Sequence, residues 1–150
     1  NMCKDQQPLG IANFRWEKLS DGYDNGGAGL ELRARDLAKL GLLWQQQGLW
    51  GSQQLISRAF LQDAATVQHA SNQTFAGLSL KGYGYGWWLF QQAGKPAGQL
   101  GWGYGGQFVL TVPEQNLTVV LLANNQTTQA STQENGVMQL ATQWFLPAAQ

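Results

Sequence analysis

Cysteine, histidine and charged residues are scarce in this chain of 150 residues. It has one cysteine, Cys3, and one histidine, His69. Such a chain forms no internal disulfide and no cysteine or histidine cluster for a metal, so we expect neither a metal nor a cofactor. Charged side chains make up 12% of the sequence, about half the usual share. Nine basic residues balance nine acidic ones, and no basic patch indicates a nucleic-acid partner.

Long apolar runs are also lacking. None comes near the roughly 20 residues that a membrane-spanning helix needs, so we expect no membrane span. No secretory signal peptide is visible, but Asn1 does not look like a natural start, and we expect that an N-terminal segment is missing. Hydrophobic residues still make up 43% of the chain, which is enough for the core of one domain.

Hydrophobic periodicity predicts helices on both sides of a group of strands. The helices are expected at about 35–47, 57–67 and 133–146, and the strands at 83–91, 107–112 and 117–123. Ser57 is the expected cap of the second helix, in which Phe60 is expected to face inward, and Trp144 belongs to the apolar stripe of the third. Residues 1–30 are interpreted as irregular and residues 68–82 as a polar loop. The order predicts an α+β fold, in which helices pack on an antiparallel sheet of about three to four strands.

The last predicted strand is strongly apolar. An apolar strand at the edge of a sheet invites pairing with a further strand. We therefore expect either a missing N-terminal half or a second copy of the chain to pair with the open strand near 117–123.

The stretch from Gly98 to Gln126 is the most informative about function. A glycine-rich turn opens directly into an apolar strand, which returns through a tight turn at 113–116. Glycines at such a place let main-chain N–H groups approach a ligand or a reacting oxygen closely. No obvious nucleophile–base pair accompanies it, so the chain is predicted to carry one wall of an active site without the reactive groups.

Four motifs follow one another along nearly the whole chain. They are PLGI at 8–11, GGAGL at 26–30 with RDLAKLG at 35–41, YGYGWW at 83–88, and GGQ at 105–107 leading into the hairpin. In this order they resemble the C-terminal portion of the class C β-lactamase and penicillin-binding-protein superfamily of serine hydrolases, closest to its esterase-like and amidase-like branch. The resemblance implies a partial β-lactamase/transpeptidase-like fold.

The chemistry of this family requires a Ser-x-x-Lys motif, a Tyr-x-Asn motif and a Lys/His/Trp-x-Gly strand edge. No serine here has a lysine three residues on, and the family's tyrosine would fall before Asn1. Tyr23-Asp24-Asn25 is interpreted as a polar loop. Residues 1–150 are therefore expected to be a single C-terminal segment that lacks the N-terminal half with the nucleophile and is inactive alone.

The third motif is present in divergent form at residues 100–106, without a Lys-Thr-Gly sequence. The resemblance aligns Gly103 with the closing glycine of the motif. It aligns Tyr104 with the residue whose main-chain N–H completes the oxyanion hole. The residues expected to border the substrate are Trp102, Gly105, Gly106 and Trp88.

The resemblance implies a small-molecule substrate with an ester or amide bond, with β-lactams and D-amino-acid peptides among the candidates. It favours a periplasmic or secreted location in bacteria. The alternative is a small carbohydrate-binding module, because seven tryptophans and many amide side chains suit stacking on sugars and bonding to their hydroxyls.

Overall fold

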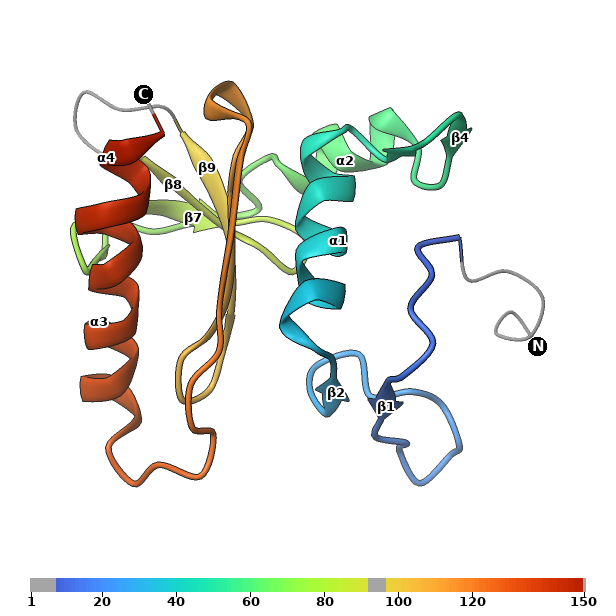
Figure 1. Ribbon diagram of the computed structural model, residues 1–150, viewed down its shortest axis with the longest axis horizontal. Coiled ribbons are helices and arrows are strands. Elements are labelled where there is room, and N and C mark those ends of the chain that lie inside the picture. Colours follow the sequence, from blue (N-terminus) through green and yellow to red (C-terminus); the bar gives the residue numbers. More distant parts are fainter. Residues whose placement is uncertain (1–7, 92–96, 150) are drawn as a thin grey trace.

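The computed structural model describes residues 8–91 and 97–149, so Cys3 lies outside the described residues. Three layers follow one another in Figure 1: α3 (Ala130–Leu140) lies on one side of a central sheet, and α1 (Ala34–Gln45) lies on the other. Helix α2 (Arg58–Ala64) lies next to α1. The fold is α+β with an antiparallel sheet, as the sequence predicts.

The central sheet is larger than predicted, because the described residues alone contribute seven strands to it in place of three or four. Its order is β11-β10-β9-β8-β7-β5, every pairing is antiparallel, and β6 pairs with β7. Strand β11 therefore lies at one edge. The strands are β5 (His69–Ala70), β6 (Thr74–Phe75), β7 (Leu78–Tyr83), β8 (Trp88–Gln91), β9 (Gly98–Gly103), β10 (Gln107–Val112) and β11 (Leu117–Leu121).

The predicted polar loop at 68–82 is wrong, because this segment forms β5, β6 and most of β7. Ala76 and Gly77 make the two-residue turn between β6 and β7, and both have positive φ, at 46° and 90°. Turns of this kind match the twist of a hairpin, but they usually carry Asn-Gly or Asp-Gly. Because alanine stands at the first position here, the sequence did not indicate this turn. The predicted strand 83–91 is likewise divided, because β7 ends at Tyr83 and β8 begins at Trp88.

The three predicted helices are present with shifted ends. Ser57 caps α2 as expected, since its side chain accepts a hydrogen bond from the Phe60 main-chain N–H at 3.2 Å. Phe60 itself was predicted to point inward, but it is 51% exposed. Helix α3 continues through a π-helical turn (Ala141–Phe145) into α4 (Leu146–Ala148). That turn changes the register, so Trp144 is exposed although the helical stripe predicted it to be buried.

The main core fills the space between the sheet and α3. Leu100, Phe108 and Leu110 from the central strands pack there with Met138 of α3. On the opposite face α1 contacts β10 and β11. Before α1, the described residues include a short ribbon of β1 (Arg15–Trp16) and β2 (Leu30–Glu31). Between α1 and α2, β3 (Leu49–Trp50) pairs with β4 (Gln53–Gln54).

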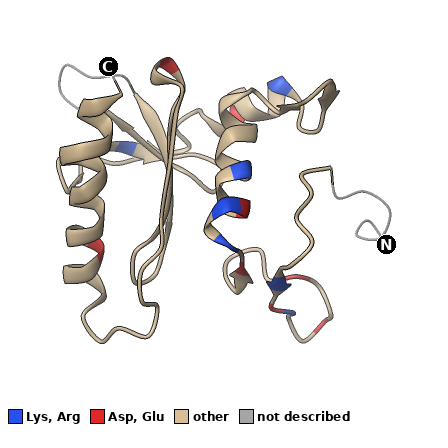
Figure 2. Ribbon diagram, viewed as in Figure 1, with Lys and Arg blue, Asp and Glu red and all other residues tan. Residues whose placement is uncertain are grey.

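Charged side chains are unevenly distributed. Figure 2 shows them mostly on α1, α2 and the segment before α1, whereas the sheet and α3 carry few. Among the described residues, no helix combines the length and the apolar character that crossing a bilayer requires.

Candidate active site

The glycine-rich turn joins β9 to β10. Gly103 pairs with Gln107, so residues 104–106 reverse the chain. Gly105 and Gly106 have φ values of +76° and +92°, which residues with side chains rarely adopt. The two glycines are therefore required by the turn itself.

Two neighbouring segments hold this turn. The Gly105 N–H donates to Glu134 Oε1 at 2.8 Å, and Gln133 Nε2 donates to the Gly105 carbonyl at 2.6 Å. Gln107 Nε2 donates to the Ala123 carbonyl at 2.7 Å, just after β11. Tyr104 Oη donates to the Thr127 carbonyl at 3.3 Å. The turn is thus tied both to α3 and to the segment that follows β11.

The outer side of the turn borders a hollow of about 600 Å³. Trp102, Gly103 and Tyr104 line it on one side, and the loop 25–30 lines it on the other. Asn25 shapes that loop, because its carbonyl accepts from Trp16 Nε1 at 2.8 Å and its side chain accepts from the Gly27 N–H at 3.0 Å. Within the part of the chain that the structure describes, no charged side chain lines the hollow.

The main-chain N–H of Tyr104 donates to no other residue within 8–91 and 97–149. It lies just beyond the end of β9, where sheet pairing stops. A main-chain donor without a protein partner beside a hollow can bind an oxygen atom of a ligand. The geometry is therefore compatible with the predicted oxyanion donor.

The six predicted site residues do not all lie together. Trp102 lines the hollow, while its ring also stacks on Phe75 with centroids 4.0 Å apart. Trp88 packs edge-on against Tyr83, at 5.1 Å, and does not line the hollow. Gly105 and Gly106 lie against Asn124, Ala123 and Val137 instead. The hollow thus brings together three of them: Trp102, Gly103 and Tyr104.

Sequence reasoning missed Gln133, Glu134 and the loop 25–30 as neighbours of the turn. Glu134 could have been singled out from the sequence, because it is the only charged residue among residues 115–150. It is also buried, with 8% of its surface exposed. A lone charge in an otherwise uncharged segment indicates a specific partner, here the Gly105 N–H. Tyr23-Asp24-Asn25 lies in a polar loop, in which Tyr23 is 74% exposed and Asn25 is half-buried.

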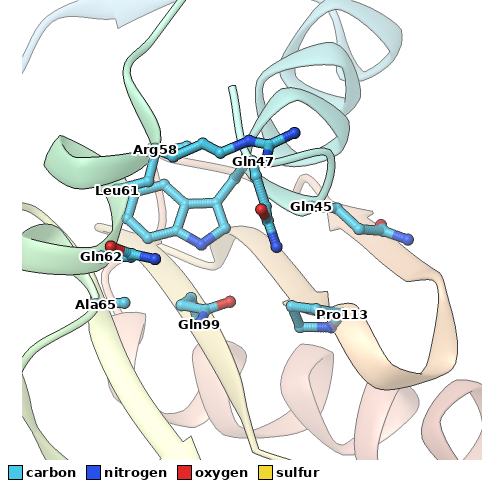
Figure 3. Close-up of a pocket in the computed structure, with 9 residues that line it drawn as sticks. Gln45, Gln47, Arg58, Leu61, Gln62, Ala65, Gln99 and Pro113 are labelled. Atoms are coloured by element: carbon cyan, nitrogen blue, oxygen red, sulfur yellow. The ribbon is translucent and has the colours of Figure 1, made fainter. Parts of the chain in front are cut away.

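A smaller hollow of about 190 Å³ lies between α1, α2 and the sheet (Figure 3). Gln47, Arg58, Gln62 and Gln99 surround it with polar groups. Gln99 stands near the start of β9, at the other end of this strand from Tyr104. None of its lining residues pairs a nucleophile with a base. Within the described residues, no group of three His, Cys, Asp or Glu side chains is placed to hold a metal ion.

Comparisons with known proteins agree with this architecture. The structure is similar to one named "Putative 6-aminohexanoate-dimer hydrolase from Bacillus anthracis", with a TM-score of 0.67 and 22% sequence identity. The match covers 89% of this chain but only 32% of that protein. No curated protein matches the chain significantly. The profile of the family called Beta-lactamase matches residues 4–143, nearly the whole sequence, and the chain therefore belongs to that family.

Proposed function

We propose that this chain is the C-terminal segment of a serine hydrolase that cleaves ester or amide bonds. The observation that carries the proposal is the Tyr104 N–H, which has no partner among the described residues and lies beside a hollow. Membership of the Beta-lactamase family supports it, as does the structural neighbour, which is named a hydrolase.

In this proposal the reactive groups come from an N-terminal half of the same domain. A serine attacks the substrate carbonyl, while a lysine and a tyrosine of that half move the protons. The carbonyl oxygen becomes an oxyanion and accepts a hydrogen bond from the Tyr104 N–H. Gly103, which has no side chain, lets the substrate lie close to the strand end. Water then hydrolyses the acyl-enzyme.

The lining of the hollow supports a substrate that is uncharged where it contacts this chain. Trp102, Gln107 and Asn125 offer an aromatic surface and amide groups but no cation. β-Lactams and D-amino-acid peptides carry a carboxylate, which is usually bound by a basic side chain. We therefore place neutral esters and amides ahead of both.

Two surfaces support the proposed contact with an N-terminal half. The first is an apolar groove of about 440 Å³ between the segment before α1 and α1 itself, and Phe14, Trp16, Leu40 and Leu43 are among its lining residues. The second is the edge of β11, which has no further strand beside it among the described residues. A large apolar groove and an apolar sheet edge both favour burial against other chain segments.

No specific observation favours the carbohydrate-binding alternative. The Trp102 ring is stacked on Phe75, so the sugar-stacking surface it was expected to offer is partly occupied. Among the described tryptophans, Trp144 is the most exposed, at 69%, and it lies on the π-helical turn beyond α3. Saturable sugar binding that is lost in Trp102→Ala would favour the alternative over the hydrolase.

Replacement of the Tyr104 main-chain N–H tests the proposed function directly. In the intact protein, Tyr104→Pro removes the donor, whereas Tyr104→Phe keeps it and removes only the hydroxyl. We expect Tyr104→Pro to lower kcat by about 10²- to 10³-fold, as the loss of one oxyanion donor does. Tyr104→Phe should stay within a few-fold of the wild type. Ester hydrolysis kinetics and circular dichroism of both variants provide the measurement.

The result against the proposal is a folded Tyr104→Pro variant with the kcat of the wild type. Covalent labelling gives a second check, because a serine-directed fluorophosphonate should label the intact protein but not residues 1–150 alone. Stoichiometric labelling of a serine within residues 1–150 would show that the nucleophile had been assigned to the wrong half.

A further inference from the structure

Both polar main-chain groups of Gly105 are bound by adjacent side chains of α3. Glu134 accepts from its N–H at 2.8 Å, and Gln133 donates to its carbonyl at 2.6 Å. Gln133 Nε2 also donates to the Asn124 carbonyl at 2.8 Å, which ties the turn to the segment after β11. We call Gln133 and Glu134 the α3 clamp.

The clamp sets the direction of two consecutive peptide units. All described peptide bonds are trans, so the C=O and N–H of one unit point in opposite directions. Since the Gly105 N–H points to Glu134, the Tyr104 carbonyl points away from it. Since the Gly105 carbonyl points to Gln133, the Gly106 N–H points away from that side chain. The Tyr104 residue thus lies between β9, which is paired with β10 up to Gly103, and a clamped Gly105.

A turn with two adjacent glycines needs such a restraint. Gly105 and Gly106 adopt positive φ without a side chain to limit other conformations, so little in the turn itself opposes rotation of a peptide unit. A rotated unit would move the neighbouring Tyr104 N–H relative to the hollow. Preorganised donors stabilise an oxyanion because they need no reorientation during the reaction.

Burial of the Glu134 carboxyl group costs free energy unless a hydrogen bond or an ion pair compensates for the lost hydration. It is buried at 8% exposure, and no ion pair involves it among the described residues. Its described hydrogen bond is the one from the Gly105 N–H. A hydrogen bond to an ionised group is shorter and stronger than one between neutral groups. Glu134 is the one acidic residue of α3, and Figure 2 shows few charged residues on this helix and on the sheet.

We propose that Glu134 is a positioning residue that fixes the oxyanion donor of Tyr104, with Gln133 as its helper. This inference rests on the proposed function. It assigns Glu134 no contact with substrate and no proton transfer, because the side chain acts through the Gly105 peptide. Its signature is therefore a change in kcat with little change in KM, together with increased mobility of the turn.

The test compares variants of the intact protein. We expect Glu134→Ala to lower kcat about tenfold to a hundredfold, the factor that corresponds to a hydrogen bond with a charged group, and to leave KM nearly unchanged. Glu134→Gln keeps an acceptor oxygen and should recover most of the activity. Gln133→Ala should fall between the two. The matched control is Asn135→Ala, since Asn135 lies on the same helix and its side chain donates to the Ser131 carbonyl and bonds to no other described residue.

Hydrogen–deuterium exchange of the turn 104–107 is the second readout. Exchange should be faster in Glu134→Ala and unchanged in Asn135→Ala. A folded Glu134→Ala variant with wild-type kcat would overturn the positioning role, and so would unchanged exchange of the turn. If Glu134→Ala does not fold, Gln133→Ala and Glu134→Gln decide by the same two readouts. A wild type that neither hydrolyses esters or amides nor reacts with a fluorophosphonate would instead overturn the proposed function, whatever the exchange shows.

Discussion

At the scale of single residues, Gly41 sets how closely α1 approaches the sheet. A β-carbon at this position would lie 2.7 Å from Thr118 Cγ2 and 2.9 Å from Val109 Cγ2. Such distances are too short for carbon atoms, so only glycine fits without a shift of the helix or the strands. Nearby, Thr118 donates to the Gln45 side chain at 2.7 Å, which aligns α1 with β11.

Replacement of two helical glycines by alanine should therefore change the free energy of unfolding in opposite directions. We expect Gly41→Ala to lower the free energy of unfolding by about 1–3 kcal/mol, because the added methyl overpacks the interface. Gly136→Ala, in α3, meets no atom within 4 Å. It should raise the free energy of unfolding by about 0.5–1 kcal/mol through helix propensity alone. Urea denaturation measures both, and a change of the same sign in the two variants would contradict the packing argument.

At the scale of elements, α2 is the clearest case of a helix whose start is decided locally. Ser57 has an extended backbone conformation, and its side chain accepts from the Phe60 N–H. Leu61 and Ala64 then face the interior on successive turns. The helix has only seven residues, so the loss of one cap is a large part of its own stability.

Removal of this cap should be measurable. Ser57→Ala leaves the N–H of Phe60 without its partner, and we expect a loss of about 1 kcal/mol in the free energy of unfolding. The control is Ser52→Ala, a change at an exposed position outside the helices. Equal urea midpoints for the two variants would mean that the cap contributes nothing.

At the scale of the whole molecule, β11 has one neighbouring strand, β10, and its other edge is unpaired among the described residues. Its Val119 is buried in the main core, and the face of the strand toward α1 is covered by that helix. The unpaired groups are therefore those along the strand edge. Such an edge associates readily with another strand.

Residues 1–150 produced alone should consequently self-associate, and a charge on the edge strand should reduce this. We expect light scattering to show dimers or larger species for the wild-type segment and mainly monomer for Val120→Lys. Lysine is a common protection of natural strand edges. Thr127→Lys, outside the strand, is the control. A monodisperse monomer for the wild-type segment would remove the argument for an open edge.

Local signals predicted several elements well, because each is encoded within a few residues. The Ser57 cap, the turn at 113–116 and the glycines of residues 103–106 lie where the sequence indicates. Strand β9 was not predicted, because its glycines are typical of a turn and not of a strand. Its glycines are explained by neighbours far along the chain: a β-carbon at Gly98 would lie 2.3 Å from the Thr111 carbonyl oxygen. No local pattern contains that contact.

The family, the α+β class and the glycine-rich turn can be identified from the residues alone, because motif order, periodicity and backbone freedom are properties of short segments. The set of predicted site residues that border the hollow, and the contact between Glu134 and Gly105, are visible in the folded molecule and not in the sequence. These depend on how α3 packs across the sheet, and a hydrogen bond between residues 29 positions apart exists only once that packing has formed.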